Sequence, residues 1–210
     1  MPYATTALIV ACAAIAVGER FGQDLGFRLL FVPYFAEEEP YRFLSSAFLH
    51  AGFWHILPNM YMLWLLGSIL EPLLGTWRFV SIYVLSAVAG NAVVLITADR
   101  LSSSWTTVTV GASGAVFGLL GAQLVVARLS GSDLTNLMVV VGLNLVIGFM
   151  PNMNISWQSH LGGFIAGLAM MAALVRTRTL GTRARPVADG AVLAGMAVLI
   201  VALIVWGFRG

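Results

Sequence analysis

Seven long apolar stretches make up most of this 210-residue chain, and their length limits the folds open to it. They lie at about residues 3–18, 50–70, 77–98, 111–129, 134–150, 160–175 and 190–208. A helix needs about 20 predominantly apolar residues to cross a bilayer, whereas membrane barrels use alternating strands of about ten residues. Because these runs are continuous, the sequence predicts an all-α, polytopic membrane helical bundle.

The composition excludes a soluble globular protein, since 60% of the residues are hydrophobic and only 10% are charged. We expect the first stretch to remain as a span, because no basic region precedes Ala4 as it would in a signal peptide. The single cysteine, Cys12, lies within that stretch and cannot form an internal disulfide.

The arginines predict the orientation of the chain. Four of them follow the sixth stretch: Arg176, Arg178, Arg183 and Arg185. The positive-inside rule assigns their loop to the cytoplasm, and counting back also assigns the N-terminus to the cytoplasm. The long first loop, about residues 19–49, is then expected outside.

A small set of polar side chains lies at the outer ends of the even-numbered stretches. The set contains all three histidines of the chain: His50, His55, Asn59, Ser113 and His160. Even-numbered stretches all run from outside to inside, so these residues share one leaflet at similar depth. Ionisable groups in a membrane are costly and usually mark function, so we expect them to form one site.

The chemistry of the set favours nucleophilic catalysis. Serine becomes a good nucleophile when a base takes its proton, and His160 is the candidate base for Ser113. His55 and Asn59 are four residues apart, hence on one helix face, and both can donate to a developing oxyanion. No carboxylate lies near, so the pattern predicts a Ser–His dyad rather than a triad.

Glycines accompany the candidate nucleophile and base. Gly111 and Gly114 allow an unusual backbone and a close approach beside Ser113. Small residues four apart also let helix backbones approach closely. Two such pairs occur in the fourth and sixth stretches: Gly114 with Gly118, and Gly163 with Gly167.

These motifs resemble the rhomboid family of intramembrane serine proteases. "GASG" at 111–114 resembles the family's GxSG nucleophile motif, "HAGFWHILPN" at 50–59 its second-span pattern, and "SHLGGFIAG" at 159–167 its HxxGxxxG motif. "YR" at 41–42 is similar to the WR pair of the first loop, and Glu71 with Gly75 matches the ExxxG pattern.

The resemblance implies a role for each matching residue. Ser113 is expected to be the nucleophile and His160 the general base and acid, with His55 and Asn59 as the oxyanion pair. Supporting roles are implied for His50, Arg42, Gly111, Gly114, Phe117, Gly163 and Gly167, the last two packing the sixth helix against the fourth.

The chain departs from the family pattern at four positions. Tyr41 replaces tryptophan, Ser159 replaces alanine before the base, and Pro58 removes a backbone donor near the start of the second helix. Phe117 stands where tyrosine is frequent, and it can stack on His160 without offering a hydroxyl.

The resemblance implies a domain plan and a reaction. We expect a six-span catalytic core at 1–176, an arginine-rich cytoplasmic linker at 177–189 and an added C-terminal span at 190–210. The expected reaction is hydrolysis of transmembrane segments of protein substrates within the bilayer, through an acyl-enzyme and without metal, cofactor or nucleic acid. A bacterial inner membrane is the expected location, with the active site toward the external face.

Three other functions fit parts of the pattern. The first is a catalytically inactive rhomboid-like factor that binds membrane proteins. The second is a transporter with the histidines as a proton relay, although no acidic residue lies at mid-membrane. The third is an intramembrane metalloprotease, although the chain has no HExxH motif.

Overall fold

The computed structural model describes residues 2–22, 24–135, 138–139, 142–143 and 156–209. Six long helices appear in it: α1 (Tyr3–Gly18), α4 (Phe53–Leu74), α5 (Thr76–Thr97), α6 (Ser113–Leu129), α8 (Trp157–Thr177) and α9 (Ala184–Arg209). The connections carry short helices: α2 (Leu25–Leu29), η1 (Pro33–Phe35), α3 (Arg42–Ser45), η2 (Ser46–Phe48) and η3 (Ser103–Thr106). The chain is therefore a polytopic helical bundle, as the apolar stretches predict.

The helices differ in how completely they could cross a membrane. α4, α5, α8 and α9 are long and apolar enough to span, whereas α1 and α6 are shorter apolar helices. α4 continues through Pro58 without a break. The expected fifth span at 134–150 lies largely outside the described residues. α9 begins at Ala184, so residues 184–189 of the expected linker form its first turns.

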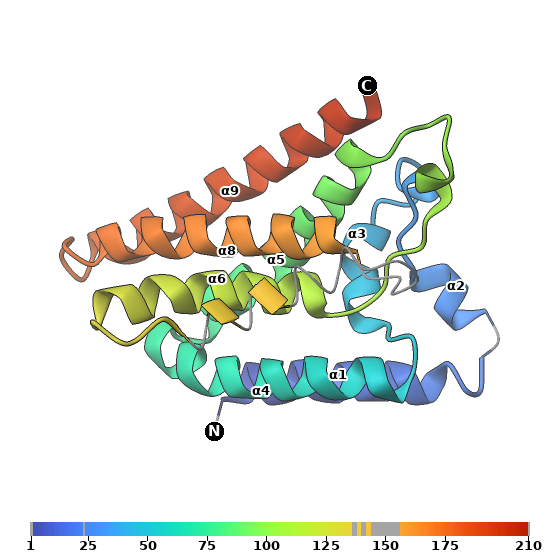
Figure 1. Ribbon diagram of the computed structural model, residues 1–210. Helices are drawn as coiled ribbons and strands as arrows, with labels where there is room; N and C mark the ends of the chain where they lie inside the picture. The colour runs from blue at the N-terminus through green and yellow to red at the C-terminus, as the bar shows by residue number, and fades with distance from the viewer. Residues whose placement is uncertain (1, 23, 136–137, 140–141, 144–155, 210) are drawn as a thin grey trace.

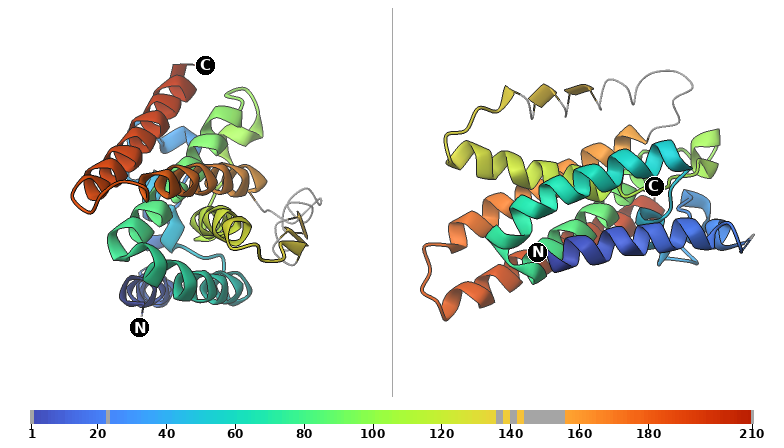
Figure 2. Two further views of the ribbon diagram at one scale, coloured as in Figure 1. Left: turned by 90° about the vertical axis from the view of Figure 1, so that its left-hand side faces the viewer. Right: turned by 90° about the horizontal axis from the view of Figure 1, so that it is seen from below.

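α8 lies at the centre of the bundle, packed against both α5 and α6 (Figures 1 and 2). α1 packs beside α4 in a separate layer, and α9 packs on the far side of α5. α6 and α8 begin at the end of the bundle where α5 and α9 finish, on the right of Figure 1. The arginine-rich turn between α8 and α9 lies at the opposite end.

The backbones of α6 and α8 touch at glycines. A Cβ atom added to Gly163 would lie 1.9 Å from the carbonyl oxygen of Gly114, and one added to Gly167 would lie 1.9 Å from that of Gly118. Neither position has room for any side chain. The contact fixes the register of the two helices, and with it the relative height of their first residues.

Carboxylates join the outer helices to this core. Glu71 of α4 accepts hydrogen bonds from the backbone N–H groups of Ala4 and Thr5, each at 2.9 Å, and so caps the start of α1. On the other side, the buried Asp189 of α9 pairs with Arg78 of α5 at 2.6 Å and accepts a hydrogen bond from Thr177 of α8. The last helix is thus tied to α5 and α8.

We expect Gly167→Ala to lower the thermal unfolding temperature sharply, because its methyl group would force α8 away from α6 at a cost of about 1–3 kcal/mol. Gly195→Ala is the matched control, since a Cβ there meets nothing within 4 Å. The control is expected to gain up to about 1 kcal/mol from helix propensity. Equal unfolding temperatures for the two variants would refute the backbone contact.

Candidate active site

The segment before Ser113 is an extended strand-like stretch attached to the first loop. The alternating "TVTV" favours extended backbone. Phe31 and Thr109 form an antiparallel bridge with N···O distances of 3.1 and 2.8 Å. Gly111 then turns with φ of +119°, a value that L side chains rarely adopt, and α6 begins at Ser113. The serine therefore stands at a helix N-terminus, half-buried.

Ser46 supports this turn, a role that the sequence did not indicate. Its carbonyl oxygen accepts a hydrogen bond from the N–H of Gly111 at 2.9 Å. Its hydroxyl accepts one from the side-chain amide of Asn91 at 2.8 Å, and the same amide donates to the carbonyl of Phe43 at 2.9 Å. Asn91 on α5 thus positions the segment of the first loop that holds the turn before Ser113. The only sign of this role in the sequence is that Asn91 is a polar residue within the third apolar stretch.

His55 lies beside the same turn. A Cβ on Gly111 would sit 2.8 Å from both Cε1 and Nε2 of His55 and 3.7 Å from Oγ of Ser113. The imidazole of His55 and the hydroxyl of Ser113 therefore both lie close to Gly111. Nδ1 of His55 accepts a hydrogen bond from the N–H of Ala51 at 3.2 Å. In a neutral ring Nε2 then carries the proton, so the donor faces the turn.

His160 lies in the first turn of α8, and its ring stacks on Phe117 with centroids 4.2 Å apart and planes 7° from parallel. Phe117 is one turn after Ser113 on α6, so the histidine ring covers the helix face on which the serine begins. Nδ1 of His160 is buried and makes no hydrogen bond with the described residues. Among the residues that the structure describes, stacking on Phe117 rather than a carboxylate orients this ring.

Ser159, next to the candidate base, lies where α5, α6 and α8 meet. Its Oγ is 2.6 Å from the points where a Cβ would stand on Gly90 and on Gly114. The two glycines leave room for this side chain, which is slightly larger than the alanine of the family pattern. Because Gly114 follows Ser113 directly, this contact brings the starts of α6 and α8 together.

Asn59 and His50 both lie near His55. Asn59 is buried one turn further along α4 and donates one amide N–H to the carbonyl of His55 at 2.9 Å. An asparagine amide has a second N–H donor. His50 is buried just before α4, and its ring meets that of His55 edge to face, with centroids 5.3 Å apart.

Arg42 is buried within the first loop and organises it. Its guanidinium pairs with Glu39 at 2.8 Å and donates to the carbonyls of Phe27 and Leu30 at 2.6 and 2.8 Å. The hydroxyl of Tyr41 also donates to Glu39, and this hydrogen bond lowers the pKa of the Glu39 carboxyl. Arg42 therefore acts on the loop that carries Ser46 rather than on the serine itself.

The chain is similar in sequence to proteins of one known family. The Rhomboid domain family matches residues 37–177. RHOMBOID-like protein 5 of Arabidopsis thaliana is 38% identical over 138 residues, 62% of this chain and 43% of that protein. Rhomboid protease GluP of Bacillus subtilis is 36% identical over 145 residues, 66% of this chain and 27% of that protein. Putative rhomboid protease YdcA of the same organism is 32% identical over 147 residues, 68% of this chain and 71% of that protein.

Fold and site together define a multi-pass helical membrane protein with a serine and three histidines gathered at one end of the bundle. The family match covers more than half of the chain, and the protein belongs to the rhomboid family. The chain spans less than half the length of the first two relatives.

We expect Gly111→Ala to abolish reaction of Ser113 with a fluorophosphonate probe, because the methyl group would displace the ring of His55. Gly131→Ala is the matched control: Gly131 also has a positive φ, +68°, but a Cβ there meets nothing within 4 Å. Both variants are expected to lose about 1–2 kcal/mol of stability to backbone strain. Labelling of Gly111→Ala at the control's rate would contradict the placement of His55.

Proposed function

We propose that the protein is an intramembrane serine endopeptidase that uses Ser113 as nucleophile and His160 as base. The observation that carries the proposal is the convergence on the first turn of α6. The ring of His55 lies against Gly111, and the ring of His160 lies on Phe117. The relatives named as rhomboid proteases support the same reaction.

The first half of the reaction forms an acyl-enzyme. Oγ of Ser113 attacks the peptide carbonyl carbon while His160 takes the hydroxyl proton. The carbonyl oxygen becomes an oxyanion, stabilised by Nε2–H of His55, the amide of Asn59 and the free N–H groups at the start of α6. The C–N bond then breaks, and His160 gives its proton to the leaving amine.

The second half of the reaction hydrolyses the acyl-enzyme and restores the free enzyme. Water loses a proton to His160 and attacks the acyl carbon, and collapse of the second tetrahedral intermediate returns the proton to Oγ of Ser113. No metal or cofactor enters either half.

The length of α6 supports a reaction inside the membrane. Its 17 residues extend about 25 Å, less than the bilayer's hydrocarbon core of about 30 Å. Arg128 is exposed in its last turn and favours the headgroup level. The other end, with Ser113, then lies below the opposite surface. A substrate helix must unwind to expose its carbonyls there, which favours helix-breaking residues near the cleaved bond.

The arginine-rich turn supports the orientation. Arg176, Arg178 and Arg183 are exposed at the end of the bundle opposite Ser113. We therefore propose that this turn and the N-terminus are cytoplasmic and that the site opens outward, in a bacterial inner membrane. The proposed partners are transmembrane proteins.

We expect a fluorophosphonate probe to label the membrane-embedded wild type at Ser113. Labelling is expected to disappear in Ser113→Ala and to fall strongly in His160→Ala, since the serine loses its base. Ser130→Ala, an exposed serine at the other end of α6, is the control and is expected to label fully. A wild type that neither labels nor cleaves any membrane-protein substrate, while retaining client binding, would instead support the inactive binding factor.

Asn59→Ala is expected to lower kcat by roughly ten- to a thousand-fold with little change in KM, because one oxyanion donor contributes up to about 3–4 kcal/mol. The measurement is cleavage of a membrane-embedded model substrate. Ser68→Ala, an exposed polar residue on the same helix, is the control and is expected to keep wild-type turnover. Unchanged kcat in Asn59→Ala would remove this residue from the oxyanion site.

A further inference from the structure

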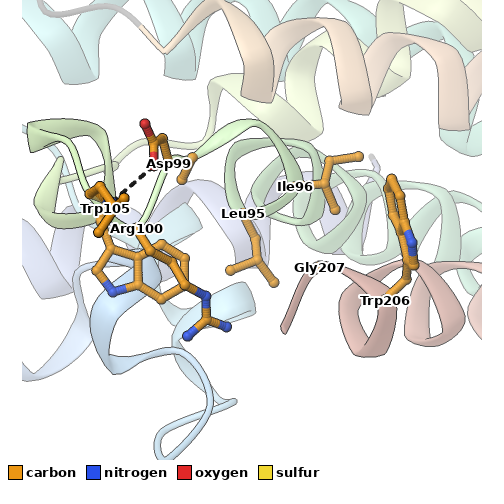
Figure 3. Close-up of a pocket in the computed structure, with 9 residues that line it drawn as sticks. Leu95, Ile96, Asp99, Arg100, Trp105, Trp206 and Gly207 are labelled. Carbon is orange, nitrogen blue, oxygen red and sulfur yellow. Dashed lines mark hydrogen bonds between the residues drawn. The ribbon is translucent and has the colours of Figure 1, made fainter. Parts of the chain in front are cut away.

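A cavity of about 370 Å³ lies away from the candidate active site, between the end of α5, the loop carrying η3 and the last turns of α9 (Figure 3). Its lining combines apolar, aromatic and charged side chains, among them Leu95, Ile96, Asp99, Arg100, Trp105 and Trp206. Because α5 and α9 finish where α6 begins, the cavity opens at the end of the bundle that holds Ser113.

Arg100 places a cation in this cavity in a defined position. Its Nη2 donates to the carbonyl of Phe208, in the last turn of α9, at 2.6 Å. Its guanidinium carbon lies 4.5 Å from the centroid of the Trp105 ring. Within the described part of the chain, no carboxylate lies at ion-pair distance from it. A guanidinium has five N–H donors in a fork that matches phosphate oxygens, and the bond to Phe208 uses one of them.

The rest of the cavity matches the other parts of a phospholipid. Leu95 and Ile96 form an apolar wall, and Gly207 lets α9 approach it closely, since a Cβ there would lie 2.8 Å from Ile96. Trp206 is 62% exposed, and indole rings favour the headgroup level of a bilayer. Toward mid-membrane, α9 exposes Leu199, which is about two turns before Trp206 and so lies on the same face of the helix.

We propose that this cavity binds the headgroup of a membrane phospholipid, with Arg100 on the phosphate and the acyl chains along α9. Asp99 also lines the cavity, and its Oδ1 accepts a hydrogen bond from the N–H of Leu101 at 2.9 Å, so a negative group accompanies Arg100 at the edge of the site. This complementarity favours a zwitterionic headgroup with a protonated amine, such as phosphatidylethanolamine. The lipid then bridges α9 and α5, the helix whose Gly90 faces Ser159 beside the candidate base.

The test measures the unfolding temperature of delipidated protein in detergent micelles, so it does not depend on proteolysis. Dioctanoyl phosphatidylethanolamine is expected to raise it by about 3–5 °C. Arg100→Gln is expected to lose most of this rise. Arg20→Gln is the matched control, an exposed arginine at the same end of the bundle, and is expected to keep the full rise.

Three further probes separate the contributions that the headgroup, the acyl chains and the charge make to the rise in unfolding temperature. Dioctanoylglycerol has the chains without phosphate, and glycerophosphoethanolamine has the headgroup without chains; each is expected to give little rise. Dioctanoyl phosphatidylglycerol lacks the amine and is expected to give a smaller rise than phosphatidylethanolamine. An equal rise with any of these three, or an undiminished rise in Arg100→Gln, would overturn the proposal.

Arg100 also contacts α9, so Arg100→Gln starts from a lower unfolding temperature, and the quantity compared is the increment that the lipid adds. Trp206→Leu provides an independent variant that leaves the guanidinium in place. It removes one aromatic wall, and the lipid increment is expected to fall by about half. An unchanged increment in Trp206→Leu would place the lipid elsewhere.

Discussion

The direct backbone contact between α6 and α8 determines the geometry of the candidate site. Helices in lipid gain little from the hydrophobic effect, because lipid tails are as apolar as the side chains that would pack, so close van der Waals contact must hold them together. The pairs Gly114–Gly163 and Gly118–Gly167 provide that contact. Since Ser113 and His160 each lie within three residues of one of these glycines, the register of the contact sets the relative height of these two side chains. A shift of one turn would change that height by about 5.4 Å.

Non-helical backbone at membrane depth must also find hydrogen-bond partners. The segment before Ser113 finds them in Phe31, through the bridge, and in Ser46, which accepts a hydrogen bond from Gly111. Both partners belong to the first loop, whose shape depends on the buried Arg42. Residues more than 60 positions before Ser113 therefore fix the backbone that leads to it. A soluble protein could leave such groups to water, whereas this chain needs the first loop as part of the candidate site.

The sequence predicted the elements well where the cause was local. The continuous apolar runs predicted the helices, and the four-residue spacing of the glycines indicated helix faces that can approach closely. Both patterns depend on residues that are near one another along the chain. The stacking of Phe117 on His160 was expected from the resemblance to the rhomboid family, and the structure has it. The missed features were long-range: Asp189 is 111 residues from its partner Arg78, and Ser46 supports a glycine in another loop. The arginines suggested a linker over 177–189 before the last span, whereas α9 begins at Ala184 and Arg185 pairs with Asp189 within it.

The way His160 is oriented has a consequence for the proposed chemistry. In a triad, a carboxylate fixes the tautomer of the base and stabilises its cationic form. Here the ring stacks on Phe117 and its Nδ1 is buried, so shape rather than charge sets its orientation. The face of an aromatic ring is negative, and stacking on it gives a developing imidazolium some stabilisation. That contribution is smaller than a buried ion pair would give. Orientation by shape requires neighbours that fit closely, and Ser159 beside His160 packs against Gly90 and Gly114.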